Sequence, residues 1–257
     1  MRIARCAIDD AVDFAVVEST DDGEVVALLA AHPFGAIQFS GVRHRVEDVR
    51  LLAPMLPSKI IAVARNYADH AKEMGGEVPE QPMIFLKPST SVIGPNDAIL
   101  LPRQSEQVDY EGELAVVIGS FCREVDPSRA SEVILGYTVA NDVTARDLQR
   151  SDGQWSRAKG FDTFCPLGPW IETDLDVTDL AIETTVNADV RQHGRTSQLV
   201  HSIAELIAFV SAAMTLLPGD VILTGTPAGV GALHDGDTVA VSIEGIGTLS
   251  NRVMSRA

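Results

Sequence analysis

The chain has 257 residues, of which 46% are hydrophobic and 22% are charged. This composition excludes an intrinsically disordered protein, because such a chain buries enough apolar surface to offset the entropy lost on ordering. No uncharged apolar run reaches about 18 residues, so we expect no membrane-spanning helix. The first residues lack the apolar stretch of a secretory signal. We therefore expect a globular protein that resides in the cytoplasm.

The formal net charge of −16 arises from 36 acidic and 20 basic side chains. This excess of acids argues against a nucleic-acid partner and against an anionic membrane surface, because both would be repelled. It does not argue against a small anionic substrate, which needs only a locally basic site. The three cysteines are widely separated and form no CxxC pair, so we expect free thiols in a reducing compartment.

The first 57 residues are expected to form a small strand-rich N-terminal domain. Short apolar segments at 2–8, 13–19 and 23–30 are typical of strands. Two prolines in 51–57 mark a connection. Residues 58–257 would then form the catalytic domain.

The pattern in the second domain indicates more strands than helices. Apolar runs bounded by turn residues predict strands at 59–65, 82–88, 112–119, 136–142 and 221–225, and a hairpin over 238–253. Helical spacing follows at 66–74, after Asp126-Pro127, and after Ser202, which forms a capping box with Glu205. The fold class is therefore mostly β with a few helices, an α+β architecture without βαβ alternation.

Three carboxylates indicate a site for a divalent cation. Glu111 and Glu113 are two residues apart on an expected strand, so both point to the same face. They repel each other unless a cation lies between them; the alternative is two solvated acids at the start of a strand. Asp142 ends another expected strand and would complete an oxygen cage suited to Mg²⁺.

A histidine and a glutamate form a second candidate pair. His70 and Glu73 are spaced i, i+3 and share a helix face. A carboxylate beside an imidazole fixes its tautomer and raises its basicity, as a general base requires. The alternative is an ordinary surface pair on an exposed helix.

Several other polar residues carry more than one interpretation. Arg65, Lys87 and Lys159 could pair with the acids, bind a substrate carboxylate, or stabilise an enolate oxygen, and the sequence leaves these uses open. Thr224 and Thr226 lie in a glycine-rich loop that follows an expected strand. Such loops offer backbone N–H groups to anions, so we expect it to hold a carboxylate.

Six ordered segments of the chain resemble the fumarylacetoacetate hydrolase family. They are ARNYADHAKEMG, IFLKPSTSVIGP, YEGELAVVIG, GYTVANDVTARDLQ, SDGQWSRAKGFDTFCPLGPW and MTLLPGDVILTGTPAGVG. The resemblance implies a β-roll of mixed sheets, usually a homodimer, around Mg²⁺ or Mn²⁺ bound by Glu111, Glu113 and Asp142. It also implies that His70 and Glu73 activate water on a lid and that Lys159 lies beside the reacting enolate. Arg146, Gln149 and Thr226 match residues that contact substrate, and we place Arg65 and Lys87 with them.

The resemblance implies metal-stabilised enolate chemistry on a small anionic keto acid. Our leading hypothesis is hydrolysis of the C–C bond of a 2,4-dioxo acid such as an acylpyruvate, because a pure decarboxylase would not need His70 and Glu73. The alternatives are oxaloacetate decarboxylation and isomerisation of 2-hydroxyhepta-2,4-diene-1,7-dioate or 5-carboxymethyl-2-hydroxymuconate in aromatic catabolism. A binding protein without activity on the same fold is a further alternative, less compatible with so many functional groups. We expect the segment 66–82, with Gly75-Gly76 and two prolines, to be a mobile lid in the absence of ligand.

Overall fold

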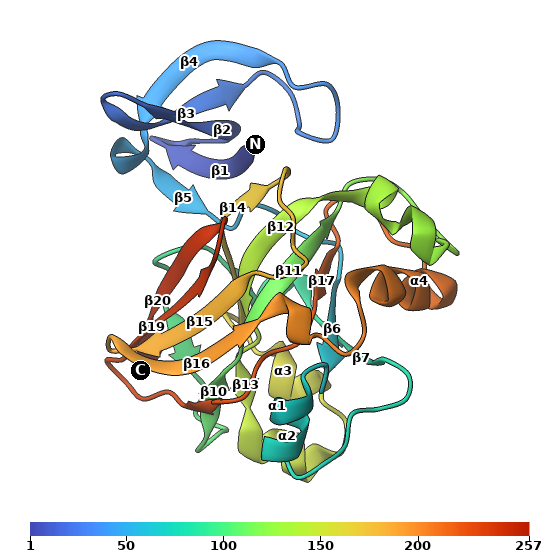
Figure 1. Cartoon of the computed structure of the whole chain (residues 1–257). Helices are drawn as coiled ribbons and strands as arrows, with labels where there is room; N and C mark the ends of the chain where they lie inside the picture. The colour runs from blue at the N-terminus through green and yellow to red at the C-terminus, as the bar shows by residue number, and fades with distance from the viewer. Residues whose placement is uncertain (257) are drawn as a thin grey trace.

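The computed structural model describes residues 1–256 and contains three β-sheets with short helices at their edges (Figure 1). Strands outnumber helices along the whole chain. The predicted fold class, mostly β with a few helices, is therefore confirmed.

The largest sheet has twelve strands and joins the N-terminal strands to the rest of the chain. β1 pairs antiparallel with β14, so one sheet crosses the predicted domain boundary, and the division at residue 57 stays a prediction. The strands of this sheet, in spatial order, are β4 (Phe39–Arg45), β3 (Gly23–Leu29), β2 (Ala11–Thr20), β1 (Arg2–Ile8), β14 (Cys165–Glu172), β12 (Ile134–Asn141), β11 (Gly112–Ile118), β17 (Val221–Leu223), β6 (Ile60–Ala64) and β7 (Met83–Lys87), with β5 (Arg50–Leu52) on β1 and β8 (Val92–Ile93) on β14.

The five-stranded sheet packs against the large sheet, and the three-stranded sheet shares a buried apolar cluster with the five-stranded one. The five-stranded sheet has the order β16 (Asp189–Arg195), β15 (Ala181–Val186), β19 (Thr238–Ile243), β20 (Gly247–Ser255) and β9 (Ile99–Leu101). The three-stranded sheet consists of β13 (Thr144–Ala145), β10 (Val108–Tyr110) and β18 (Gly231–Ala232). The predicted C-terminal hairpin is thus present as β19 and β20.

β11 lies in the centre of the fold. All seven of its residues are buried, which explains why its sequence is a continuous apolar run rather than an alternating one. A Cβ at Gly112 would lie 2.2 Å from Thr184 Oγ1, so glycine at this position lets β11 pass close to β15. This close packing carries the residues on either side of Gly112 into the interior.

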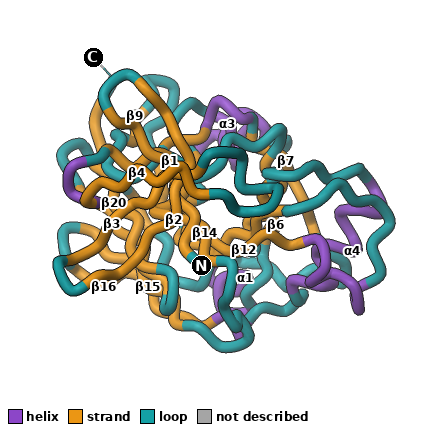
Figure 2. Tube along the Cα trace, turned by 90° about the horizontal axis from the view of Figure 1, so that it is seen from above, coloured by secondary structure: helices purple, strands orange, loops and turns teal. Residues whose placement is uncertain are grey.

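The helices are short and lie around the sheets. α1, α2 and α3 lie in the lower part of the molecule in Figure 1, where α2 contacts α3. α4 packs beside β6 and β17 on another side (Figures 1 and 2). The capping box of Ser202 and Glu205 is present at the start of α4, and the segment after Asp126 is a 3₁₀ helix. The helices are α1 (Ala68–Glu73), α2 (Arg146–Asp152), α3 (Ser156–Gly160) and α4 (Ile203–Ala213), with 3₁₀ turns η1 (Val46–Asp48), η2 (Ser89–Ser91), η3 (Pro127–Val133) and η4 (Thr196–Gln198).

β14 is the clearest strand that the sequence pattern did not indicate. Its sequence CPLGPWIE contains two prolines and a glycine, which usually mark turns. Pro169 lies where the pairing of β14 with β12 is irregular, and proline is tolerated in a strand at such positions.

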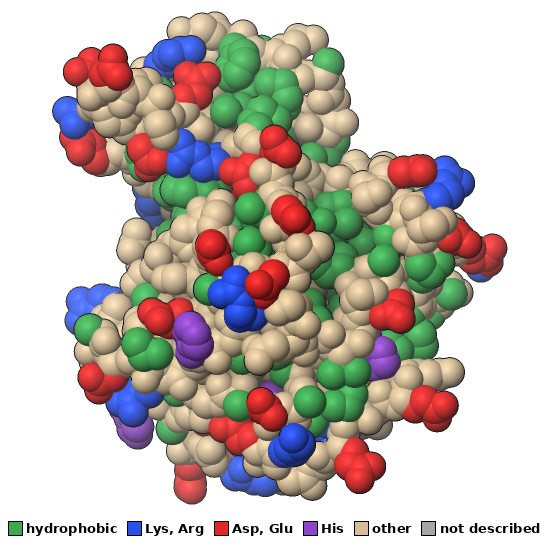
Figure 3. Space-filling model, viewed as in Figure 1, with side chains coloured by type: hydrophobic (Ala, Val, Ile, Leu, Met, Phe, Trp, Pro, Cys, Tyr) green, Lys and Arg blue, Asp and Glu red, His purple; other side chains and the backbone are tan. Residues whose placement is uncertain are grey.

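Charged side chains of both signs are spread over the surface in Figure 3, with no single basic patch on this face. None of the helices in residues 1–256 combines the length and hydrophobicity needed to span a bilayer. The three cysteines are buried free thiols.

Candidate active site

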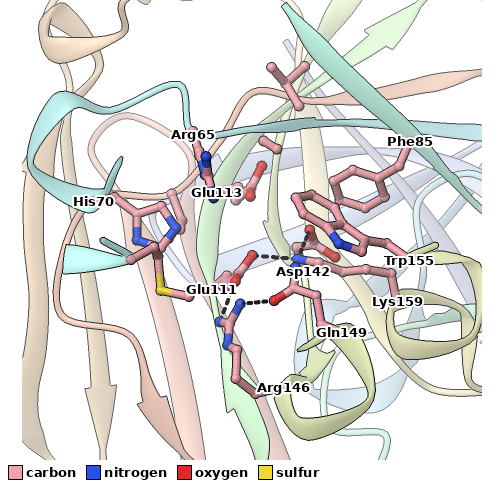
Figure 4. Close-up of a pocket in the computed structure, with 14 residues that line it drawn as sticks. Arg65, His70, Phe85, Glu111, Glu113, Asp142, Arg146, Gln149, Trp155 and Lys159 are labelled. Atoms are coloured by element: carbon pink, nitrogen blue, oxygen red, sulfur yellow. Dashed lines mark hydrogen bonds and ion pairs between the residues drawn. The ribbon is translucent and has the colours of Figure 1, made fainter. Parts of the chain in front are cut away.

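A cavity opens between β6, the start of β11, and helices α1 to α3. Carboxylates, cations and one imidazole line it together with an apolar wall (Figure 4). The apolar wall consists of Val63, Ala64, Met74, Phe85 and Trp155. A lining that combines an apolar wall with a few convergent polar groups is typical of a site for a small molecule.

Glu111, Glu113 and Asp142 come together at this cavity. Ligand atoms of the three carboxylates all lie within 4.8 Å of one another, and all three residues are buried. The antiparallel pairing of β11 with β12 aligns Gly112 with Asn141, so Glu111, before β11, and Asp142, after β12, are brought together. The Asp142 backbone N–H donates to the Glu111 carbonyl at 2.8 Å and fixes this arrangement.

Buried cations neutralise part of this negative charge. Lys159 Nζ donates to Glu111 Oε2 and to Asp142 Oδ2, at 2.7 Å each. Arg146 donates to Glu111 Oε1 at 2.6 Å and to Asp109 Oδ2 at 2.8 Å. Asp109 thereby adds a fourth carboxylate to this network of buried ion pairs.

The three carboxylates differ in how well they are compensated. Burial alone would raise the pKa of Glu111, but Lys159 and Arg146 outweigh it and hold that pKa well below its usual range. Burial raises the pKa of Glu113 well above its usual value, and the charges of Asp142 and Glu111 raise it further. The Gly225 N–H donates to Glu113 Oε2 at 2.6 Å and opposes this only in part. Among residues 1–256, no cationic side chain forms an ion pair with Glu113.

A divalent cation would supply the missing charge. The donor set consists of carboxylate oxygens only, which suits a hard cation such as Mg²⁺ or Mn²⁺ and not zinc. Four buried acids, Asp109 among them, face three buried cations in this network. The uncompensated charge of Glu113 fits a bound cation, and this is the observation on which we rest the metal assignment.

His70 and Glu73 form a second unit on α1. His70 Nδ1 lies 3.2 Å from Glu73 Oε2, and because a carboxylate only accepts, Nδ1 carries the proton and Nε2 is free to accept one. The Gly229 N–H donates to both oxygens of Glu73, at 3.0 and 3.2 Å. A Cβ at Gly229 would lie 2.2 Å from the Arg191 carbonyl oxygen, with φ at +103°, so only glycine suits this position.

The glycine-rich loop holds carboxylates that belong to the protein itself. Gly225 binds Glu113 and Gly229 binds Glu73. The Thr226 hydroxyl donates to the Gly112 carbonyl at 2.8 Å and accepts from Gln192 Nε2 at 2.7 Å. The loop thus connects the carboxylate triad with α1.

Six of the predicted catalytic and substrate-binding residues line the cavity directly, besides the three carboxylates. They are Arg65, His70, Arg146, Gln149, Lys159 and Thr226. Glu73 reaches the cavity only through His70. Lys87 donates to Asp142 Oδ1 at 2.5 Å and to the Val143 carbonyl at 3.2 Å and is absent from the cavity lining. Its use as a substrate-binding residue stays a prediction that these contacts do not support.

Other residues of the site were not predicted. Asp109 anchors Arg146, and its signal was available, because it extends the two-residue spacing of Glu111 and Glu113. Gln192 accepts from the Gly112 N–H at 3.0 Å, but no local pattern marks a single buried glutamine on β16. Phe85 and Trp155 form an aromatic edge-on pair with centroids 5.4 Å apart.

Comparison with family models divides the chain into two matched parts. Residues 59–254 match the model described as fumarylacetoacetate (FAA) hydrolase, C-terminal. Residues 1–54 match the model described as Rv2993c-like, N-terminal.

Curated relatives match most or all of the chain. Protein Rv2993c of Mycobacterium tuberculosis is 56% identical over 262 residues, covering 100% of this chain and 99% of that protein. The mitochondrial oxaloacetate tautomerase FAHD2A of Homo sapiens is 46% identical over 220 residues, covering 80% of this chain and 70% of that protein.

Solved structures show the same fold. A structure named 5-carboxymethyl-2-hydroxymuconate delta-isomerase from Mycobacterium smegmatis is 56% identical with a TM-score of 0.94, covering 100% of both chains. A structure of maleylpyruvate hydrolase from Sphingobium sp. SYK-6, in complex with manganese(II) and pyruvate, is 32% identical with a TM-score of 0.82, again covering 100% of both chains.

Proposed function

Because the chain belongs to the fumarylacetoacetate hydrolase family, we propose that it is a divalent-metal-dependent enzyme acting on a 2-oxo acid. The reaction is a proton transfer at the carbon beside the 2-oxo group, as in a keto–enol tautomerase or an isomerase. One observation carries this proposal: an imidazole with a fixed tautomer and a cluster of three carboxylates line the same small cavity.

The carboxylate cluster is the place for the metal. Mg²⁺ or Mn²⁺ held by Glu111, Glu113 and Asp142 would supply a Lewis acid that draws electron density from the 2-oxo group and its neighbouring carbon. The Lys159 ammonium donates hydrogen bonds to Glu111 and Asp142, which orient both carboxylates. It also adds positive charge where an enolate oxygen develops.

His70 is the residue that moves the proton. Its Nε2 accepts a proton from the carbon next to the carbonyl group, and the electron pair of that C–H bond becomes the enolate. Glu73 accepts from Nδ1–H and stabilises the imidazolium that forms. The imidazolium then gives its proton to the enolate oxygen, which yields the enol. In the reverse direction, the enol O–H proton is removed and Nε2 returns a proton to carbon, so no other reactant is needed.

The relatives support proton transfer more than bond cleavage. The structure that is 56% identical is named an isomerase, and the human relative at 46% identity is named a tautomerase. Two compared structures that are named as hydrolases are 39% and 32% identical. Isomerases and tautomerases both move protons through an enol, which requires only the groups described above.

Hydrolysis of a 2,4-dioxo acid remains the second candidate. The specific observation in its favour is the His70–Glu73 pair, which would also activate water, together with the TM-score of 0.82 to maleylpyruvate hydrolase. Oxaloacetate decarboxylation would use the same enolate without this pair. We also propose, from the family resemblance, a cytoplasmic homodimer that serves in aromatic catabolism.

The test separates proton transfer from cleavage. Purified enzyme with Mg²⁺ or Mn²⁺ is incubated in D₂O with oxaloacetate, 2-oxobutanoate and acetylpyruvate. NMR follows deuterium uptake at carbon 3, and a coupled assay follows pyruvate release. We expect metal-dependent exchange that exceeds any cleavage and that Glu113→Gln abolishes.

Pyruvate release from acetylpyruvate that outpaces exchange would select the hydrolase. Pyruvate release from oxaloacetate alone would select the decarboxylase. If metal-loaded enzyme catalysed neither exchange nor cleavage of any of these acids, the enolate mechanism would be refuted.

A further inference from the structure

Tyr110 lies between two acids of the active site without lining the cavity itself. Asp109 and Glu111 both bind Arg146, so these two acids share one side of the chain. Side chains alternate along an extended chain, and Tyr110 points to the other side. Its ring is buried in an apolar cluster, and it is absent from the cavity lining. Any effect of its hydroxyl on the reaction must therefore be indirect.

The Tyr110 hydroxyl binds the glycine-rich loop at Gly229. It donates to the Gly229 carbonyl at 2.9 Å. The φ of Gly229 is +103°, in a region that glycine enters readily, and glycine is also the residue with the most conformational freedom to lose. A hydrogen bond to its carbonyl removes part of this freedom. Tyr110 thereby sets the direction of the backbone groups of Gly229.

The loop leaves space for this hydroxyl at Gly231. Gly231 is the residue opposite Tyr110 in the antiparallel pair of β18 and β10. A Cβ at Gly231 would lie 2.9 Å from the Tyr110 hydroxyl oxygen. Gly231 has no positive φ, so its backbone conformation does not require glycine. The contact with the Tyr110 hydroxyl is the reason the structure offers for glycine at this position.

Gly229 in turn holds the acidic partner of the proposed base. The Glu73 side chain is 33% exposed on a helix of six residues. Within the described residues, its one ion-pair contact is the imidazole of His70. The Gly229 N–H, at 3.0 and 3.2 Å from the two carboxylate oxygens, keeps this partly exposed side chain from rotating into solvent. A change in the direction of the Gly229 N–H would therefore release Glu73 from His70.

We propose that Tyr110 is a positioning residue for the base that transfers the proton. Its hydroxyl fixes the turn at Gly229, whose N–H holds Glu73. Glu73 then keeps the proton of His70 on Nδ1 and leaves Nε2 free to accept. This inference rests on the proposed function and adds a residue to the same site. Because Tyr110 does not line the cavity, it should affect the rate of proton transfer and not the binding of substrate.

The first measurement needs no turnover. The full chain is labelled with ¹⁵N-histidine, loaded with Mg²⁺ and studied by NMR at alkaline pH, where imidazoles are neutral; His70→Gln assigns the signal of His70. We expect the wild type to carry this proton on Nδ1. Tyr110→Phe should shift the population toward the tautomer with the proton on Nε2, because the Nδ1–H loses its fixed acceptor. The matched control is Tyr137→Phe, at a partly buried tyrosine of β12 outside the cavity lining, which should leave the tautomer unchanged.

The second measurement is the rate of deuterium exchange at carbon 3 of the 2-oxo acid. A neutral hydrogen bond corresponds to a factor of about 2–10, so Tyr110→Phe should lower kcat by about this factor. KM and the dissociation constant of Mg²⁺ should stay unchanged. In a Glu73→Gln background the effect of Tyr110→Phe should vanish, because its path to the imidazole is already broken.

A second variant displaces the hydroxyl without removing it. Gly231→Ala places a Cβ against the Tyr110 hydroxyl and should give a comparable loss of kcat and the same shift in tautomer. It gives the answer if Tyr110→Phe does not fold. Its control is Gly35→Ala, where the nearest atom to the new Cβ is 4.0 Å away, and this variant should keep the wild-type rate.

Three results would overturn the inference. They are a His70 tautomer that is the same in Tyr110→Phe and the wild type, a loss of kcat that is equally large in the Glu73→Gln background, and weaker binding of Mg²⁺ by Tyr110→Phe. The last would place the effect of Tyr110 at the neighbouring Glu111. If the wild type catalyses no exchange, the proposed function fails, and the NMR measurement still decides whether Tyr110 sets the tautomer.

Discussion

Replacing Glu113 by glutamine should stabilise the metal-free protein and remove most of its response to metal. Glutamine keeps the shape of the side chain and an oxygen that accepts from the Gly225 N–H, now 2.6 Å from Glu113. It removes a buried charge that faces Glu111 and Asp142. An uncompensated buried charge costs about 1–3 kcal/mol or more, so we expect a gain in the free energy of unfolding of this order.

Bound metal should stabilise the Glu113→Gln variant less than it stabilises the wild type. At a metal concentration 100 times the dissociation constant, binding stabilises the wild type by about 2.7 kcal/mol. This corresponds to about 5–10 °C in melting temperature for a chain of this size. If loss of one anionic ligand weakens binding about 100-fold, the same concentration gives only about 0.4 kcal/mol.

The pH dependence of the folding stability follows from the raised pKa of Glu113. The pKa of Glu113 is raised in the folded state, so the folded protein binds more protons than the unfolded chain between the two values, and stability falls as pH rises through this window. The chelated wild type should therefore gain stability from pH 7.5 to 5.5 relative to Glu113→Gln. Thermal melts with chelator and with Mg²⁺ measure all three effects. A variant that is no more stable than the wild type in chelator, or that keeps the full metal response, would refute the reasoning.

Three further changes test other parts of the site. Glu73→Gln should lower kcat about 10–100-fold with little change in KM, because it disturbs the His70 tautomer. The control is Asp69→Asn, on the exposed face of α1. A kcat of Glu73→Gln equal to that of the control would contradict this. Gly229→Ala should destabilise by about 1–3 kcal/mol in urea unfolding, because its Cβ meets the Arg191 carbonyl oxygen. Gly153→Ala, also at positive φ but in open space, should cost less, and equal losses would exclude the steric argument. Lys87→Met should cost about 3–5 kcal/mol, because it leaves Asp142 without one of its partners; an unchanged urea midpoint would show that this ion pair is dispensable.

The spacing of residues along the sequence predicted those pairs of site residues that lie on a single strand or helix. The two-residue spacing of Glu111 and Glu113 and the three-residue spacing of His70 and Glu73 translate directly into a shared face. The structure shows both pairs at the cavity or next to it. The capping box at Ser202 is predictable for the same reason, since all its hydrogen bonds join neighbours in sequence.

Contacts between distant segments could not be derived in this way. Lys87 and Asp142 are 55 residues apart, and Lys159 and Glu111 are 48 apart. The sequence left open whether these lysines bind acids or substrate, because the choice depends on sheet order, which periodicity does not encode. β14 was missed because its two prolines and its glycine usually mark turns, and Pro169 is accommodated by an irregular register with β12.

The segment around α1 connects the proposed base with the Arg65 side of the cavity. His70 and Glu73 lie on α1, and Gly76, three residues later, packs on the Arg65 guanidinium. Two contacts tie this segment to the rest of the chain: the Gly229 N–H to Glu73, and His201 Nε2 to the Pro79 carbonyl at 3.0 Å. If the segment moves as a lid, as its glycines and prolines predict, its closure would place His70 and bring Gly76 against Arg65 in one step. Proton transfer would then depend on this closure, and Gly76→Ala, whose Cβ would meet the Arg65 guanidinium, should lower kcat in a deuterium-exchange assay; an unchanged kcat would contradict this.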